Sequence, residues 1–167
     1  ALINRRALRA FRSTNYWPRF LKNGEERAVT GSVVPYTESG KDSIDTYLRI
    51  HKHALWRNRS VQEYDIMVTA AGATLVAGAL HPTEAYVTYK RQFTDTFGDA
   101  QGESTAIPAE WFQYMAHGTY ADYLRAEGQQ EKAALADQEA DMLLQEEMIR
   151  IDEQHTLQMV ANRVFTN

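Results

Sequence analysis

Two groups of side chains have the types and spacing that could do chemistry. A His-x-His pair, His51 and His53, lies in the first half of the chain, and two histidines on one strand face can ligate a metal. Guanidinium groups bind phosphates and carboxylates. Four of them are grouped at the amino end: Arg5, Arg6, Arg9 and Arg12.

Neither group has the further residues that would make it a catalytic or metal site. The remaining histidines and the carboxylates stand at no diagnostic spacing from the His-x-His pair. Neither a Gly-x-Ser-x-Gly nucleophile motif nor a phosphate-binding Gly-Lys-Ser/Thr loop occurs in the sequence. Adjacent carboxylates, such as Glu146 and Glu147, are typical of a solvated surface. The sequence therefore predicts no metal, no cofactor and no catalytic residue, and a protein that is not an enzyme.

Composition narrows the class of protein further. The chain has 167 residues, 44% of them hydrophobic, with no cysteine, four prolines and a net charge of −4. This length suits one domain, or one domain with an insertion. The hydrophobic content excludes a disordered chain, and the lack of cysteine excludes a disulfide scaffold, thiol catalysis and cysteine-ligated metal.

The net charge conceals a strong asymmetry along the chain. Residues 1–60 carry +7, residues 61–100 carry −3, and residues 101–167 carry −8. Such a distribution suggests contact with nucleic acid, with a charged partner or with other copies of the chain. A single monomer with one basic and one acidic solvated face is the alternative.

The arginines lie in a predicted amphipathic helix that ends before Tyr16. At about 100° per residue, the four arginines fall on one arc, opposite an apolar one. The arginine face is solvated, pairs with carboxylates, or faces the phosphates of a DNA channel without sequence preference. The opposite arc holds Ile3, Ala7, Leu8, Ala10 and Phe11.

The middle of the chain predicts an antiparallel β module. From Glu25 to Arg91 the apolar residues alternate, with Ile44, Thr46, Leu48 and Ile50 on one face of a strand. The pattern gives four or five strands, the last three as a meander. Residues 66–83 form the longest uncharged run, and we interpret them as a hairpin because glycine and proline interrupt them. We expect no contact with a membrane.

The last third predicts two helices. One begins near Pro108 and ends at Gly128, and the other runs from Gln129 to about His155. The predicted fold is α+β, in which residues 1–24 and 104–155 form an α-helical bundle. Residues 25–103 form the inserted antiparallel β module with its connector, and residues 156–167 form an extended C-terminal tail.

The long last helix is apolar on more than one side. Leu135, Met142 and Ile149 recur every seven residues, and further apolar residues extend around the axis. A helix of this kind needs more than one neighbour. It is either the central helix of a monomer core or a helix that also contacts an adjacent subunit. The candidate subunit interface comprises Leu135, Met142, Ile149, Glu146 and Glu147.

The order of these parts resembles a known family. The segments that carry the resemblance are Ile3–Arg9, Tyr16–Pro18 ahead of the β insertion, Ile107–Phe112 and the corner Glu127–Gln129. Together they resemble the head-to-tail adaptor (neck or connector) proteins of tailed bacteriophages, particularly the tubular-tail adaptors of short-tailed phages. The resemblance covers nearly the whole chain.

The resemblance implies a structural virion protein. Such adaptors form a ring, commonly of twelve copies, that joins the portal protein to the tail nozzle or tail tube and surrounds the DNA exit channel. The resemblance places the protein in the host cytoplasm during assembly and then at the head-tail junction of the virion. It also implies a portal-docking role for the C-terminal tail, with candidate residues Leu157, Met159, Val160, Arg163, Val164 and Phe165.

Two alternatives remain open. Another ring-forming virion component, such as a stopper or tail terminator, is disfavoured by the two C-terminal helices, because those proteins are mostly β. A small nucleic-acid-binding or regulatory module would use the arginine-rich first helix. Salt-dependent DNA binding that requires the four arginines would favour that module.

Overall fold

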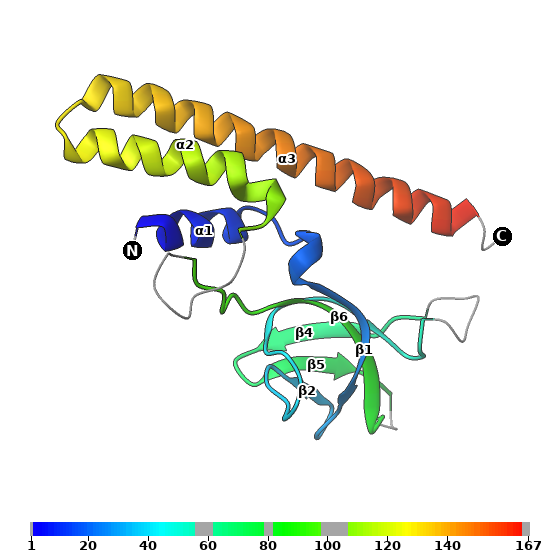
Figure 1. Ribbon diagram of the computed structural model, residues 1–167. Helices are drawn as coiled ribbons and strands as arrows, with labels where there is room; N and C mark the ends of the chain where they lie inside the picture. Colours follow the sequence, from blue (N-terminus) through cyan, green and yellow to red (C-terminus); the bar gives the residue numbers. More distant parts are fainter. Residues whose placement is uncertain (1, 56–61, 79–81, 98–106, 165–167) are drawn as a thin grey trace. The chain divides into compact units, whose positions relative to one another are not determined.

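The computed structural model describes residues 2–55, 62–78, 82–97 and 107–164, with the side chains of the last helix described as far as residue 156. It combines α-helices with antiparallel β-sheets, which confirms the predicted α+β class (Figure 1). The chain divides into two compact units. Unit 1 comprises Ala1–Arg19 and Thr94–Ala161, and unit 2 comprises Phe20–Phe93 and Asn162–Asn167.

Three helices dominate unit 1: α1 (Leu2–Ser13), α2 (Ala109–Ala126) and α3 (Gln130–Val164), which belongs to unit 1 as far as Ala161. Figure 1 shows α2 and α3 side by side as an antiparallel hairpin, with α1 next to α2. The hairpin turns at Gly128, whose φ of +80° favours glycine because it has no Cβ. Small side chains, Ala121, Ala133 and Ala136, let the two helices approach closely near this turn.

Tryptophans connect the end of α1 to the start of α2. The indole Nε1 of Trp17 donates a hydrogen bond to the carbonyl of Ala10 at 2.8 Å, so the chain after α1 folds back against that helix. The Trp17 and Trp111 rings meet edge to face with centroids 5.6 Å apart, a favourable aromatic geometry. Both side chains are buried, and they form part of the apolar interior of unit 1.

The prediction of an extended tail from residue 156 is wrong as far as Val164, because α3 continues to that residue. Asp152 and Glu153 do not end the helix, because they are exposed on its surface and remain solvated. The chain has no glycine or proline between Gln130 and Val164 that would end it. Among the described residues, no helix has both the length and the apolar content to cross a membrane.

Unit 2 contains two three-stranded antiparallel sheets. The first has the order β1-β6-β3, formed by β1 (Leu21–Ala28), β6 (Glu84–Arg91) and β3 (Ile44–His51). The second has the order β2-β5-β4, formed by β2 (Val33–Pro35), β5 (Gly72–Val76) and β4 (Asp65–Thr69). One cluster of buried residues draws on both sheets: Val34, Ile44, Tyr47, Ile50, Ala73, Leu75, Ala85, Val87 and Tyr89.

The topology departs from the predicted meander at its last strand. The β4–β5 hairpin forms as expected, but β6 leaves it and becomes the central strand of the other sheet. Register shifts in β3 also change which side chains face inward. Tyr47 is buried and donates a hydrogen bond to the carbonyl of Val34 at 2.8 Å, whereas the alternation had placed Leu48 inside.

Gly72 tests how closely β5 packs against β2. Its φ is +141°, and a Cβ built there would lie 2.1 Å from the carbonyl oxygen of Val34. Gly72→Ala should therefore destabilise the protein by about 2–3 kcal/mol or more and lower Tm by roughly 5–10 °C. Gly40→Ala is the matched control, because Gly40 also has a positive φ but open space around it. Equal Tm losses in thermal denaturation would contradict the packing at Gly72.

Candidate functional site

A buried arginine joins the three helices of unit 1. Arg6 Nε donates a hydrogen bond to Asp122 Oδ2 at 2.9 Å, and Arg6 Nη2 donates one to Asp122 Oδ1 at 2.7 Å. The guanidinium group therefore binds this α2 carboxylate in a bidentate manner. Arg6 Nη1 donates to Asp137 Oδ1 on α3 at 2.6 Å. One side chain of α1 thus bonds to both other helices.

Gly118 makes room for this side chain. A Cβ at Gly118 would lie 3.1 Å from Arg6 Cδ, closer than an ordinary van der Waals contact. A second arginine, Arg125, bonds to Asp122 at 2.9 Å and to Asp137 at 3.0 Å from the solvent side. The two carboxylates therefore lie between two guanidinium groups, and each has partners of opposite charge.

The pKa values of these groups move in the directions that strengthen the pairing. Hydrogen bonding to Asp122, above all, raises the pKa of Arg6, although burial opposes the change. The Arg6 hydrogen bonds lower the pKa of Asp122. Burial by itself would raise the pKa of Asp137, but hydrogen bonds from Arg6 and Arg125 outweigh it and leave the value lowered. All of these groups are therefore charged at neutral pH.

The expectation that all four arginines share one outer face is wrong for Arg6. Arg6 is buried together with Ala7, Ala10 and Phe11, because it stands four residues before Ala10 and so on the same side of the helix. Burial of the charge is tolerated because carboxylates from two other helices meet it. Arg5, Arg9 and Arg12 remain exposed.

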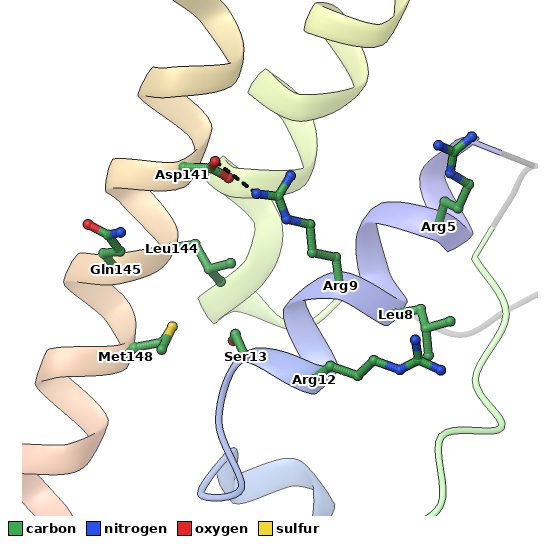
Figure 2. A pocket seen from close by; sticks show the side chains of 9 residues that line it. All are labelled: Arg5, Leu8, Arg9, Arg12, Ser13, Asp141, Leu144, Gln145 and Met148. Carbon is green, nitrogen blue, oxygen red and sulfur yellow. Dashed lines mark hydrogen bonds and ion pairs between the residues drawn. The ribbon is translucent and has the colours of Figure 1, made fainter.

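The three exposed arginines line a groove between α1 and α3, with a volume of about 550 Å³. Arg9 Nη2 bonds to Asp141 Oδ2 on α3 at 2.9 Å, as Figure 2 shows. In the same view Arg5 and Arg12 extend away from α3. Among the described residues, no carboxylate lies within ion-pair distance of either. We use "the groove" for this site, which is lined by Arg5, Leu8, Arg9, Arg12, Ser13, Asp141, Leu144, Gln145 and Met148.

A row of exposed apolar side chains runs along another side of α3. Leu135, Met142 and Ile149 are each at least half exposed, at 68%, 50% and 59%. The opposite side of the helix packs inward through Ala133, Ala136, Ala140, Leu144 and Ile151. The helix is therefore apolar on two sides, of which one is packed within unit 1. We use "the ridge" for Leu135, Met142 and Ile149.

Two glutamates predicted to accompany the ridge differ in position. Glu146 is exposed and stands four residues after Met142, so it flanks the ridge. Glu147 points elsewhere and accepts a 3.0 Å hydrogen bond from Arg150 Nε within α3. Arg150 therefore pairs with Glu147, three residues before it, and not with Glu146, four residues before it.

The apolar and aromatic side chains of α2 are only partly internal. Trp111 and Met115 are buried, but Phe112, Tyr120 and Tyr123 are more than half exposed. Residues at these spacings lie on one side of the helix. Unit 1 thus presents apolar or aromatic side chains to solvent from α2 as well as from α3.

The histidine pair does not lie on one strand, as the metal hypothesis required. β3 ends at His51, whose ring is buried with Nδ1 4.0 Å from Glu63 Oε1, while His53 lies beyond the strand and is exposed. Burial lowers the pKa of His51. In the part of the chain that the structure describes, no cluster of three or more histidine or acidic side chains has metal-binding geometry.

The candidate portal-docking residues fall at the end of the described chain. The backbone of Leu157, Met159, Val160, Arg163 and Val164 is helical, and their side chains lie outside the described part. Phe165 lies outside the described residues altogether.

The acidic partners of Arg6 and Arg9 were not among the residues predicted from the sequence. Asp137 and Asp141 are four residues apart on α3 and meet Arg6 and Arg9, which are three apart on α1. This matched spacing, together with a glycine inside a predicted helix at position 118, was the signal available in the sequence.

Replacing Arg6 should show how much its bonds to α2 and α3, the three-helix junction, contribute to the free energy of unfolding. Arg6→Met leaves two partly buried carboxylates with only Arg125, so we expect a loss of about 2 kcal/mol in urea unfolding at pH 7. Arg9→Met is the control, because Arg9 is more than half exposed and its partner Asp141 more than a third, so the loss should stay below about 0.5 kcal/mol. Equal losses would contradict a junction at Arg6.

The pH dependence of stability should also differ between wild type and Arg6→Met. The pKa values of Asp122 and Asp137 are lowered in the folded protein, so their contribution is complete above about pH 4 and is lost as the pH falls through the folded values. Wild-type stability should fall more steeply than that of Arg6→Met between pH 4 and pH 2. Parallel curves would show that Arg6 does not hold these carboxylates.

Comparison of the chain with protein-family models, with curated proteins and with solved structures finds no match. The groove and the ridge of unit 1 are the surfaces that indicate a function.

Proposed function

We propose that this chain is a head-to-tail adaptor of a tailed bacteriophage, a structural virion protein that assembles as a ring. The observation that carries the proposal is the ridge. It lies on α3 opposite a side that is already packed, so it is not needed for the interior of unit 1. An exposed apolar row on a long helix marks an interaction surface, and neighbouring copies in a ring would cover it.

Contacts made by the segments that carry the resemblance support this proposal. Trp17 and Trp111 come from the Tyr16–Pro18 and Ile107–Phe112 segments, and their rings are in contact. Asn4, from the first segment, accepts a 2.7 Å hydrogen bond from the backbone N–H of Phe97 through its side-chain oxygen. The motifs that carry the resemblance are thus structural residues of a single unit.

In this function the ring, of about twelve copies by the resemblance, would sit between portal and tail and surround the DNA exit channel. The portal protein and the tail nozzle or tube protein would be its partners. The helical segment that includes Leu157–Val164 would meet the portal. The protein would be found in the host cytoplasm during assembly and at the head-tail junction of the virion.

A ring on a portal tests the proposal. The chain mixed with purified portal rings of short-tailed phages should give stacked rings of matching symmetry in electron microscopy. Replacing all three ridge residues by Gln should abolish the stacked ring and lower Tm by no more than about 2 °C, since these side chains are exposed in the free chain.

Leu144→Gln is the control on the packed side of the same helix, because Leu144 is 6% exposed. It should lower Tm substantially by burying an amide in an apolar site. Wild-type protein that binds none of the portals would contradict the adaptor function. A triple ridge variant that still forms the stacked ring would remove the observation on which the proposal rests.

A nucleic-acid-binding module is the second candidate, favoured by the exposed guanidinium groups of Arg5 and Arg12. The ion pairs of Arg6 and Arg9 with aspartates count against it, because those guanidinium groups already have anionic partners. Two phosphate contacts would give weak binding that disappears at moderate salt.

DNA titration separates the two candidates. We expect the isolated chain to bind duplex DNA only weakly, with a slope of log K against log salt no steeper than about −2. Arg5→Gln combined with Arg12→Gln should remove that binding, while the ring on the portal is assayed independently. Submicromolar binding at physiological salt with a steep slope would favour the nucleic-acid module instead.

A further inference from the structure

We infer that the groove of one copy receives the ridge of a second copy of this chain, so that neighbouring subunits associate head to tail. The inference rests on the proposed ring and assigns its subunit contact. Two surfaces of unit 1 carry it, and they match in both polarity and charge.

The ridge is apolar with an acidic edge. Each of its residues is followed four positions later by a glutamate, and four residues is the spacing of neighbours on one helix face. All three glutamates are exposed. Glu139 also lies 3.4 Å from His117 Nδ1, whereas no basic partner is seen among the described residues for the other two. This acidic edge comprises Glu139, Glu146 and Glu153.

The groove has the complementary character. Leu8, Leu144 and Met148 give it apolar walls, and Arg5 and Arg12 stand at its α1 side with exposed guanidinium groups (Figure 2). An inserted ridge would bury its leucine, methionine and isoleucine against these walls. Its glutamates would then meet arginines in place of water, which favours this partner over an uncharged helix.

The positions of the two surfaces favour a head-to-tail contact over pairing of like surfaces. Met142 of the ridge and Met148 of the groove are about 120° apart around the α3 axis. One copy therefore uses different surfaces toward its two neighbours, which is the heterologous arrangement that closes into rings. Pairing ridge with ridge would instead place acidic edges together, and like charges oppose that arrangement.

A charge-swap experiment tests the contact. The groove variant carries Arg5→Glu and Arg12→Glu, and the ridge variant carries Glu146→Lys and Glu153→Lys. Self-association is measured by sedimentation velocity at low salt over a range of concentrations up to about 1 mM. The control carries Glu84→Lys and Asp65→Lys, two exposed acidic residues of unit 2, and it changes the net charge as the ridge variant does.

Wild type and control should associate with rising concentration, and each swapped variant alone should associate about tenfold more weakly or worse. An equimolar mixture of the two variants should recover association to within about threefold of wild type, because every groove then finds a ridge of opposite charge. A wild-type chain that stays monomeric throughout would overturn the contact. So would a ridge variant that associates like wild type, or a mixture that does not recover.

Two further measurements keep the result interpretable. Tm is recorded for each variant, and if a Glu substitution lowers it, Arg5→Gln with Arg12→Gln takes its place in the same assay. Binding of the wild-type chain to a purified portal is scored separately by electron microscopy. Portal binding without recovery in the mixture would reject this subunit contact and leave the adaptor function standing, whereas loss of both would reject both.

Discussion

The charge of Arg6 is the constraint on which the arrangement of unit 1 depends. Burying a guanidinium group is costly unless partners of opposite charge meet it, and here Asp122 and Asp137 do so from two different helices. The pairing therefore selects one rotation of α1 about its own axis. With Arg6 turned inward, Arg5 and Arg12 are turned outward, and the composition of the groove follows from that choice.

The uneven charge of the sequence has two roles, one inside unit 1 and one at its surface. Part of it is neutralised within the chain, where α1 provides the cations and the α2–α3 hairpin provides the anions. The remainder stays on the surface, as arginines beside the groove and glutamates beside the ridge. Internal pairing orients the helices, and the residual charge is available to a partner. The net charge of −4 indicates neither the internal ion pairs nor the charged surfaces.

Several elements could be predicted because their signals are local. The end of α1 before Tyr16, the β4–β5 hairpin and the corner at Gly128 each depend on a few adjacent residues. The burial of Arg6 could not be predicted from periodicity. A helical wheel sorts residues by polarity alone, whereas the carboxylates that allow this burial lie more than a hundred positions away in the sequence. The ridge could be predicted, since its seven-residue spacing is visible in the sequence.

The wrong predictions for the strands of unit 2 and for the end of α3 have different causes. β6 pairs with strands distant in sequence, and only the packing of β1 and β3 around it decides that choice. Register shifts in β3 moved Tyr47 inward, which simple alternation cannot anticipate. In α3, the charged residues near position 155 suggest an end to the helix, but an exposed carboxylate does not end one. The groove was missed because it needs side chains from both α1 and α3.

The uninterrupted course of α3 has a mechanical consequence. A helix of 35 residues is about 52 Å long at about 1.5 Å per residue, and without glycine or proline it has no built-in hinge. Rotation imposed at one end is then passed to the other with little loss. A partner that grips the last turns of α3 would also set the direction in which the ridge faces, so contacts at the two ends of this helix cannot be adjusted independently.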